Sequence, residues 1–564
     1  MALIKIQQGW VRASLKASLR ASLINLAAVI LGAVLFAASF PSIPFAYGLP
    51  LVAWIAFVPV FWVVRRASIG ACAVLGALYG YVAYGLFNYW LSVFHPLAGI
   101  LVGSIYSLYM ALLFVLLHLA VRIFPRRGYI LQFLLWMAYE YVRTLGFLGY
   151  PYGISGYSQW QMLPVIQIAS ITGVWGVSAL VVFPSAWIAA MFAADNSPEA
   201  ATANQLKMRA FFRRERVPAA VWGGLLAAAL VFGFVSPIDY SDARKVRFAL
   251  IQHNTDPWLP ARAPTPALSL ALFREDFEIL TRLSDEALAA HPDTEFVVWS
   301  ETAFVPRIHW HYTFREDRAS WYLVRDLLDY LAIQEVPFII GNHDGRRDPA
   351  LNPHGNHRVD FNAVILFEQG QIVEVYRKIH LVPFTEHFPF QDRFPRIYQA
   401  LREEDTTFWD PGTELTVFES RGLRFATPIC FEDTFGYLNR AFVRAGAEML
   451  VNLSNDAWSH SRSAKMQHLT MAVFRSVETR RSMVRSTSSG MTSAIDPNGR
   501  IIAMAEPFAQ AWLVADVPVM TRITLYTRFG DWLGVLFTAS AAVLLLFGVV
   551  SPILKRHTAT QRHR

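Results

Sequence analysis

Charged residues and cysteine are both scarce in this sequence. Only 16% of its 564 residues are charged, against roughly 25% in an average soluble protein, which indicates that part of the chain faces lipid. The chain has two cysteines, too few for a disulfide scaffold, and no histidine and cysteine pair has the spacing of metal ligands. Internal repeats and a phosphate-binding glycine loop are also absent. We therefore expect no metal and no bound cofactor.

The shortage of charge is concentrated in two parts of the chain. Nearly all long apolar runs lie in residues 1–236 and 531–554, whereas residues 240–520 have the composition of a soluble domain. A membrane-spanning helix needs about 20 mostly apolar residues, because its backbone polar groups must be satisfied internally. The sequence predicts eight such spans, at 22–40, 47–64, 69–91, 98–121, 129–147, 163–193, 217–236 and 531–554. The predicted domains are a membrane domain at 1–238, a soluble domain at 239–522, and a last span with a basic tail at 523–564.

Lysine and arginine are absent from the short loops near residues 41–46, 92–97 and 148–162. The regions at the other end of the predicted spans carry eighteen of them. By the positive-inside rule, both termini are predicted to be cytoplasmic and the soluble domain to lie outside. The net charge of +8 then reflects topology and anionic lipid, and nucleic acid is not an expected partner.

The soluble domain alternates strand and helix signals. Short apolar runs read as buried strands, and amphipathic stretches such as 268–290 and 319–333 separate them. The strand-like runs are 246–251, 296–299, 337–341, 425–430 and 449–453. This order predicts a layered α/β domain around a central sheet.

Cys430 ends one of these apolar runs and is followed by a polar loop, whereas Cys72 lies in a predicted span as a small buried side chain. Two other strand ends carry Glu301 and Lys378. A glutamate can take the proton of a thiol, and a lysine can stabilise the oxyanion that forms when a thiolate attacks a carbonyl. Each of these residues also has a simpler explanation when it is considered alone. Burial explains the cysteine, and a surface salt bridge explains the glutamate or the lysine.

Three stretches together resemble the catalytic motifs of the nitrilase superfamily, in its Glu, Lys, Cys order. They are Trp299–Glu301, Lys378–Glu386 and Ile429–Glu432. Fused to many membrane spans, such a domain is similar to the apolipoprotein N-acyltransferase family, and further stretches match it at Thr172–Ser178, Ser454–Trp458 and Arg485–Thr487. The resemblance covers nearly the whole chain. It implies an extracytoplasmic nitrilase-like αββα sandwich above a bundle of about eight helices.

The resemblance also implies roles for single residues. Glu301 would be the general base, Lys378 the oxyanion stabiliser and Cys430 the nucleophile that carries the acyl chain. Glu386 would orient the lysine. Other matching positions around the pocket are Glu432, Trp258 and Asn362.

The sequence departs from the family pattern at two positions. Phe431 stands where the family commonly has tyrosine, and Thr385 stands where it commonly has glycine. The first departure removes a hydroxyl next to the nucleophile. It therefore changes the hydrogen bonding expected there but not the three principal residues.

The implied reaction is acyl transfer in two steps. A phospholipid would acylate Cys430, and the α-amine of a diacylglyceryl-cysteine at the N-terminus of an apolipoprotein would then accept the chain. Both substrates are held in the membrane by acyl chains whose extraction costs roughly 0.8 kcal/mol per CH₂, so the site must lie at the membrane. The expected enzyme is a monomer in the inner membrane of a bacterium.

Other readings of the same residues stay open. A membrane-anchored nitrilase-type amidohydrolase would use the same three residues with water, and a scaffold with a degenerate domain would not need them. A cysteine protease could use His380 or His387, although no orienting partner stands out. Glu140 and Arg143, near the outer end of one span, form either an intrahelical pair or a headgroup site.

Overall fold

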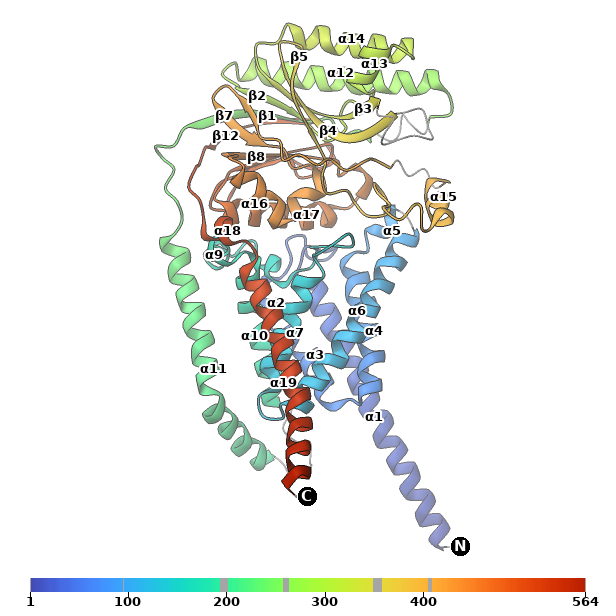
Figure 1. Cartoon of the computed structure of the whole chain (residues 1–564), viewed down its shortest axis with the longest axis vertical. Coiled ribbons are helices and arrows are strands. Elements are labelled where there is room, and N and C mark those ends of the chain that lie inside the picture. The colour runs from blue at the N-terminus through green and yellow to red at the C-terminus, as the bar shows by residue number, and fades with distance from the viewer. Residues whose placement is uncertain are drawn as a thin grey trace.

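The computed structural model describes residues 2–94, 96–192, 201–256, 263–347, 358–403 and 408–562. A helical bundle forms one half of the molecule and a β-sandwich with flanking helices forms the other (Figure 1). Both termini lie at the end of the bundle that is remote from the sandwich (Figure 1). The prediction of a membrane domain with an α/β domain attached to it is confirmed.

Six helices among the described residues are long and apolar enough to cross a membrane. Each coincides with a span predicted from the sequence. They are α1 (Ala2–Ala38), α4 (Ile69–Phe87), α6 (Pro96–Ile123), α10 (Val174–Phe192), α11 (Ala201–Val235) and α19 (Trp532–Arg562). The apolar part of α1 begins at Lys16, and that of α11 begins at Arg209. The apolar part of α19 ends at Ser551.

The other two predicted spans form shorter helices. Residues 47–64 are divided into α2 (Pro50–Ala53) and α3 (Val58–Arg66), and each begins with proline at its first or second position, where a missing N–H costs nothing. The span at 129–147 is α7 (Gly128–Val142), which has 15 residues.

The predicted span at 163–193 begins with two short helices, α8 (Leu163–Ile166) and α9 (Ala169–Thr172), before α10. Gly173 ends α9 with a φ of 64°, which favours glycine. A Cβ at this position would lie 2.6 Å from the Tyr526 ring. Close packing against the C-terminal segment therefore sets this break.

Two six-stranded sheets form the sandwich. The first has the order β12-β1-β2-β3-β4-β5 and the second β11-β10-β9-β8-β7-β6. The strands of the first are β1 (Lys245–Gln252), β2 (Phe296–Trp299), β3 (Phe338–Arg347), β4 (Arg358–Glu368), β5 (Gln371–Arg377) and β12 (Ala511–Pro518). Those of the second are β6 (Phe418–Ser420), β7 (Leu423–Ala426), β8 (Met449–Ser454), β9 (Met483–Thr487), β10 (Ser493–Ile495) and β11 (Ile501–Met504).

Alternation along the strands explains the layers. In β1, Phe248 and Leu250 belong to the same buried cluster as Phe425 of the second sheet, whereas Ala249 and Ile251 pack with the helices on the outer face. Successive side chains of a strand point to opposite faces. A strand that is apolar on both faces therefore lies between two packed layers.

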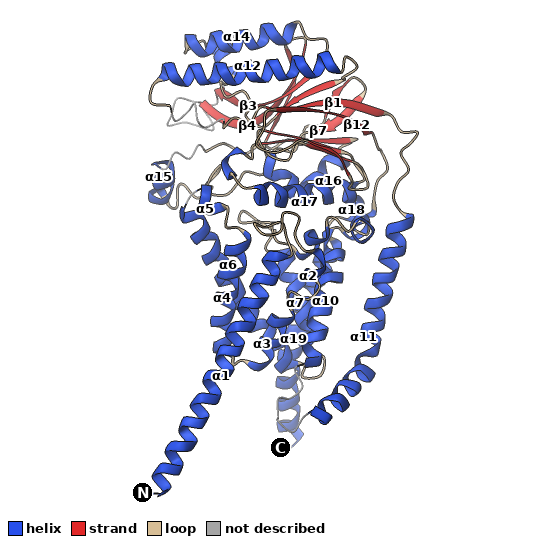
Figure 2. Ribbon diagram, turned by 180° about the vertical axis from the view of Figure 1, so that it is seen from behind, coloured by secondary structure: helices blue, strands red, loops and turns tan. Residues whose placement is uncertain are grey.

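Helices cover both outer faces of the sandwich, as Figure 2 shows from behind. On the side remote from the bundle lie α12 (Pro266–Ala290), α13 (Ile308–Phe314) and α14 (Arg318–Ala332). On the side facing the bundle lie α16 (Gly436–Arg444), α17 (Arg462–Thr479) and α18 (Leu525–Phe529). The predicted αββα arrangement is confirmed. Smaller helices are α5 (Leu91–Phe94), η1 (Ser155–Gln159), α15 (Pro395–Glu403), η3 (Cys430–Thr434) and η4 (Ala457–Ser459).

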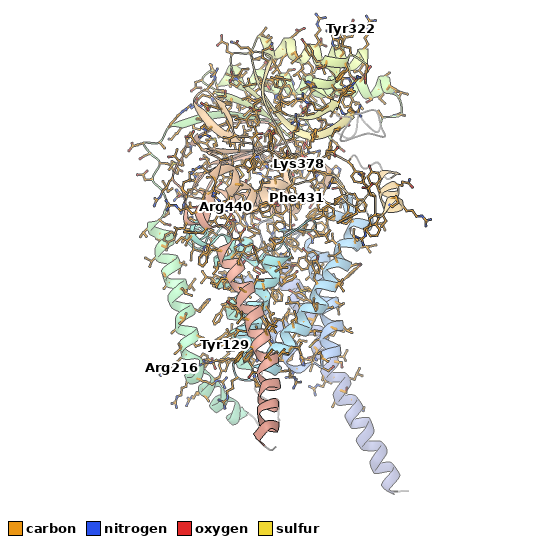
Figure 3. All side chains as sticks on the ribbon, viewed as in Figure 1. Tyr129, Arg216, Tyr322, Lys378, Phe431 and Arg440 are labelled. Carbon is orange, nitrogen blue, oxygen red and sulfur yellow. The ribbon has the colours of Figure 1, made fainter. Side chains whose placement is uncertain are left out.

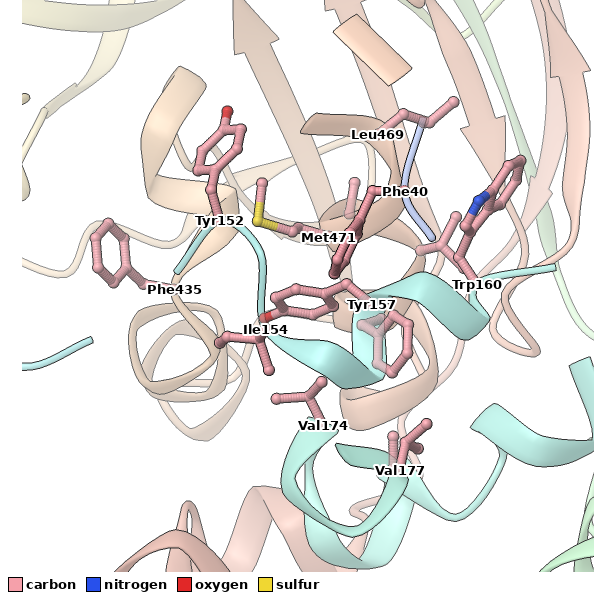
Figure 4. Close-up of a cluster of buried hydrophobic side chains, with 14 of the residues drawn as sticks. Phe40, Tyr152, Ile154, Tyr157, Trp160, Val174, Val177, Phe435, Leu469 and Met471 are labelled. Carbon is pink, nitrogen blue, oxygen red and sulfur yellow. The ribbon is translucent and has the colours of Figure 1, made fainter. Parts of the chain in front are cut away.

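Helix α17 lies at the seam between the sandwich and the bundle. Every residue from Ser463 to Thr479 is buried. Apolar side chains of α17, among them Leu469 and Met471, share a cluster with Tyr157 of η1 and Phe40 at the end of α1 (Figure 4). The two halves of the molecule are thus packed together through a continuous core.

Candidate active site

The three principal residues predicted from the sequence lie at strand ends. Glu301 follows β2 and Lys378 follows β5 in the first sheet, and Cys430 follows β7 of the second and begins η3. Figure 3 shows Lys378 above Phe431, the residue next to the cysteine. The sandwich thus brings one group from each motif to the same region.

Lys378 is completely buried between two carboxylates. Its Nζ donates to Glu301 Oε1 at 3.2 Å and to Glu386 Oε1 at 2.9 Å. Burial alone would lower the pKa of the ammonium, but Glu301 and Glu386 outweigh that effect and hold the pKa well above its usual value. The lysine is therefore a fixed positive charge, positioned as expected beside both predicted carboxylates.

Each oxygen of Glu301 has a partner. Asn362 Nδ2 on β4 donates to Oε1 at 2.8 Å, and the backbone N–H of Asn455 donates to Oε2 at 2.8 Å. Asn362 was predicted from the sequence to lie around the pocket, and the structure places it there. The carboxylate is therefore held in one orientation, as a group that must receive a proton from a defined direction needs to be.

Cys430 has an unusual backbone and an environment that disfavours its anion. Its φ is 48°, a left-handed conformation that is strained for a residue with a side chain. Burial raises the pKa of the thiol well above its usual value, Glu301 raises the pKa further, and Lys378 opposes both effects. The resting group is a neutral thiol, so it requires a base before it can attack.

Glu432 joins the lysine segment to the cysteine segment. Its Oε1 accepts from the backbone N–H groups of Ile379 at 2.8 Å and His380 at 2.9 Å. Its Oε2 accepts from the N–H of Ile429 at 2.8 Å, and the Tyr376 hydroxyl lies 2.8 and 2.9 Å from the two oxygens. Burial raises the pKa of Glu432 to about 7. The carboxylate therefore fixes the spacing between two strand ends.

Phe431 lies against the membrane domain. Its ring is stacked with those of Tyr150 and Tyr152, at centroid distances of 6.5 and 6.4 Å, and meets Phe435 edge-on at 4.9 Å. Phe431 therefore belongs to an aromatic cluster. The residue after Cys430 therefore contacts a loop at the end of the bundle that faces the sandwich.

Arg143 holds that loop. Its Nη1 donates to the carbonyl oxygens of Tyr150 at 2.7 Å and Tyr152 at 2.9 Å, whereas Glu140 accepts from the Trp136 indole at 3.2 Å and from Ser155. The two charged residues thus have separate partners. The prediction of an intrahelical ion pair was wrong, because the folded loop offers Arg143 carbonyl groups at closer range.

Trp258, also named from the sequence, lies outside the described residues. Two others, Thr385 and His380, have less to do with this geometry. Thr385 donates to the Val382 carbonyl at 3.5 Å, a long contact. His380 Nδ1 is 2.7 Å from the Tyr437 hydroxyl, so its ring is engaged away from the thiol and a cysteine–histidine pair is not formed by this residue.

Sequence reasoning missed a charged cluster behind the cysteine. His468 Nε2 is 2.7 Å from Asp433 Oδ1, and Arg485 pairs with Asp433 Oδ2. Asp433 stands only three residues after Cys430 and could have been noticed. His468 lies on a helix 38 positions away in sequence, and its part in the cluster has no local signal.

The chain matches two families of known proteins. Residues 32–187 match the Apolipoprotein N-acyltransferase N-terminal domain, and residues 247–524 match Carbon-nitrogen hydrolase. Apolipoprotein N-acyltransferase 1 of Treponema denticola is 42% identical over 546 residues, which cover 94% of this chain and 98% of that protein. The protein of the same name from Treponema pallidum is 44% identical over 535 residues, covering 93% and 96%. Apolipoprotein N-acyltransferase of Geobacter metallireducens is 32% identical over 536 residues, covering 91% and 93%.

Proposed function

The chain belongs to the apolipoprotein N-acyltransferase family, and from this premise we propose that Cys430 carries an acyl chain from a phospholipid to the α-amine of a diacylglyceryl-cysteine. The family makes the protein a membrane-embedded acyltransferase with a lipoprotein acceptor. The phospholipid donor and the roles of single residues are our proposal. The observation that carries it is the burial of Lys378 between Glu301 and Glu386, next to a neutral thiol.

In the first step, Glu301 takes the thiol proton as Sγ attacks the ester carbonyl carbon of the phospholipid. Lys378 stabilises the negative charge that develops on the carbonyl oxygen. The ester C–O bond then breaks, and the proton passes from Glu301 to the glycerol oxygen that leaves. The products are a lysophospholipid and a thioester on Cys430.

In the second step, the acceptor amine attacks the thioester carbonyl. The C–S bond breaks, the amine loses a proton, and the thiol of Cys430 is restored with an amide as product. Glu301 accepts the amine proton and returns it to the sulfur. The thioester divides a difficult displacement into two easier ones.

Contact between the site and the membrane domain favours lipid substrates over small amides. Phe431 is stacked on Tyr150 and Tyr152 of the outer loop, so the nucleophile lies next to the end of the bundle. A diacyl substrate can then react while its chains stay among lipids, which avoids extraction at roughly 0.8 kcal/mol per CH₂. An amidohydrolase of soluble substrates would gain nothing from this contact.

A mass measurement tests the proposal. Phospholipid alone should make the protein heavier by one acyl chain, through a bond that neutral hydroxylamine cleaves. Cys430→Ser should gain no such mass, whereas Cys72→Ala, the matched change at the other cysteine, should behave as the unaltered protein does. A diacylglyceryl-cysteine peptide should then remove the acyl chain and gain it as an amide. Discharge by water alone, at the same rate with and without the peptide, would instead identify an amidohydrolase.

We also propose the topology predicted by charge, with both termini cytoplasmic and the catalytic domain outside. The positions of the two termini at the far end of the bundle support it (Figure 1). A reporter fused after residue 300 should be active only outside the cytoplasm, and one fused after residue 560 only inside. The reverse pattern would place the site in the wrong leaflet.

The proposed domain limits are 1–238, 239–522 and 523–564, with a monomer as the active unit. The start of β1 at Lys245 and the end of β12 at Pro518 support the middle limits. Size measurement of the purified enzyme in detergent, with the detergent mass subtracted, tests the monomer.

A further inference from the structure

His468 contacts the nucleophile segment at two points. Its Nε2 lies 2.7 Å from Asp433 Oδ1 and 3.3 Å from the carbonyl oxygen of Cys430. On the other side of the ring, Nδ1 lies 3.5 Å from Asp456 Oδ1. The imidazole is 4% exposed. One buried ring thus joins η3 to the loop that follows β8.

The partners of the ring determine its protonation. Every group that faces its two nitrogens is an acceptor: two carboxylates and one backbone carbonyl. A neutral imidazole has one N–H and one bare nitrogen, and the bare nitrogen would face a carboxylate without a proton between them. Only the imidazolium, with an N–H on each side, satisfies both carboxylates.

The charged groups around the ring have opposing effects: Asp433 and Asp456 raise the pKa of His468, and Arg485 lowers it. Asp433 on η3 also pairs with Arg485 on β9. Asp456 Oδ2 is buried without a hydrogen-bond partner, and Lys465, one turn before His468 on α17, donates instead to Ser489 O and Oγ at 2.7 and 2.8 Å. Without the charge of His468, the cations that act on these two buried carboxylates would be Arg485 and Lys465.

The carbonyl that His468 contacts belongs to the strained residue. Cys430 has a φ of 48°, and such strain persists only where the surroundings hold it. The other side chain that reaches this carbonyl is Asn452, whose Nδ2 lies 3.4 Å away. Of these two side-chain contacts, the one from His468 is the shorter.

We infer that His468, as an imidazolium, is a positioning residue that holds the Cys430 backbone in its left-handed conformation and aims the thiol at Glu301 and Lys378. His468 acts through Cys430 and Asp433 and touches no substrate. The inference rests on the proposed function, because it assigns a task within the same thioester-forming site.

The charge of the ring is also stable at neutral pH. Burial alone would lower the pKa of His468, but Asp433 outweighs burial and raises the pKa to about 9. Because this value is above that of an unfolded histidine, the ring contributes stability fully below about pH 6.5 and loses the contribution as pH rises through 9. The hydrogen bond from His468 lowers the pKa of Asp456 to about 2 against the effect of burial.

Helix α17 anchors the ring to the membrane domain. Next to His468, Gln467 Nε2 donates to the carbonyl oxygens of Pro41 at 2.8 Å and Phe87 at 3.1 Å, and Trp90 Nε1 donates to Gln467 Oε1 at 3.0 Å. Two turns later, Arg475 donates to Thr434 O at 2.8 Å and to the Tyr157 hydroxyl at 3.0 Å. The same helix thus holds both ends of η3 and the outer end of the bundle.

Two substitutions separate the charge from the hydrogen bond. His468→Gln keeps an amide N–H that can reach the Cys430 carbonyl but removes the charge, and His468→Leu removes both. The rate of thioester formation at saturating phospholipid should fall in both variants, by about 100-fold in His468→Leu, since displacement by about 1 Å costs on the order of 10². The KM for phospholipid should stay the same within about twofold, because the ring does not touch lipid.

Alkylation of Cys430 by iodoacetamide gives a readout that does not depend on acyl transfer. In a Cys72→Ala background, the alkylation rate should be highest in the protein with His468, lower in His468→Gln and lowest in His468→Leu, because the thiol is then less well aimed at Glu301 and Lys378. A plot of log rate against pH should bend downward near pH 9, where His468 loses its proton, and the bend should be missing in His468→Gln. His291→Gln, the same exchange at the end of α12 on the far side of the sandwich, should change neither the rate nor the bend.

The outcomes are distinguishable. A role in folding alone would lower the Tm of the variants but leave the alkylation rate of the folded fraction and the bend unchanged, and that result would overturn the inference. Equal thioester formation by all three proteins would also overturn it. If the unaltered protein is alkylated as described but forms no thioester from phospholipid, the proposed function fails while the positioning of the thiol stands.

Discussion

Replacement of Glu432 by glutamine tests how strictly the two strand ends are held together. The carboxylate accepts from four donor groups, three of them backbone N–H groups. Glutamine has the same shape but only one acceptor oxygen. If that oxygen takes the place of Oε1, which faces Ile379 and His380, the amide NH₂ faces the N–H of Ile429. If it takes the place of Oε2, two backbone donors are left facing the NH₂.

The loss of stability in Glu432→Gln follows from the number of hydrogen-bond donors that lose their acceptor. Leaving a buried donor unsatisfied costs about 1–3 kcal/mol, and glutamine leaves at least one. For a domain of this size, each kcal/mol lowers the Tm by roughly 2–4 °C, so Glu432→Gln should unfold roughly 2–12 °C earlier. The catalytic effect should be larger, because moving a nucleophile by about 1 Å relative to its partners costs on the order of 10² in rate.

The assay measures thioester formation on Cys430 and the Tm of the same preparation. Glu368→Gln is the matched control, since Glu368 accepts one hydrogen bond, from Ser420 Oγ at 2.5 Å, and a glutamine oxygen can accept it equally well. The control should keep its rate and its Tm. A Glu432→Gln enzyme with the rate and Tm of the control would refute the idea that Glu432 sets the spacing between the lysine and the cysteine.

Three other measurements follow from the site and its surroundings. Lys378→Arg should lower the acylation rate by about 10² to 10³, because a planar guanidinium poorly replaces a buried ammonium beside an oxyanion. The rate is measured from the mass of the Cys430 adduct, and near-normal turnover would mean that the lysine is only a structural charge. Gly173→Ala should lower the Tm, since φ is 64° and the added Cβ would lie 2.6 Å from the Tyr526 ring; an unchanged Tm would show that this ring moves freely. Burial raises the pKa of Glu432 from 4.5 to about 7, so this group stabilises the fold fully below about pH 4.5 and loses that contribution as pH rises through 7. Only the ionised form of Glu432 accepts from all its donors, so lowering the pH from 8 to 6 should slow acylation, whereas protonation of this group should not lower the Tm. An acylation rate that does not change between pH 8 and 6 would contradict the role given to ionised Glu432.

Much of the site could be predicted because its groups stand at strand ends. A buried strand is recognisable by its apolar run, and a polar residue directly after it is brought to one edge of a sheet. This reasoning found Glu301, Lys378 and Cys430, and the resemblance supplied Glu386 and Asn362. It could not indicate that Glu301 receives a backbone N–H from Asn455, because that contact depends on how two sheets face each other.

The membrane spans show the same division between local and distant causes. Length and apolar composition located six long helices, since a continuous apolar run is a local property. The interruption at Gly173 depends on Tyr526, more than 300 positions later in the chain, whose ring occupies the space beside it. The divided segment at 47–64 contains prolines, which were visible in the sequence, but their positions at helix starts emerge only from the folded chain.

Helix α17 gives the clearest reason why part of the site had no signal. An amphipathic helix is recognised by one apolar face and one solvated face, but α17 is buried on all sides from Ser463 to Thr479, with polar residues on each. Those polar residues are acceptable only because both halves of the protein supply partners: Glu478 accepts from the Val174 N–H of the bundle at 3.0 Å, and His468 pairs with Asp433 of the sandwich. If the catalytic domain were separated from the bundle, Gln467 and Glu478 would lose their partners in the bundle, and Glu478 would keep only Arg475 of its own helix as a side-chain partner. The segment from Cys430 to Thr434, which the same helix contacts at both ends, would then lose that support. The membrane domain therefore supports the structure of the proposed site as well as anchoring it.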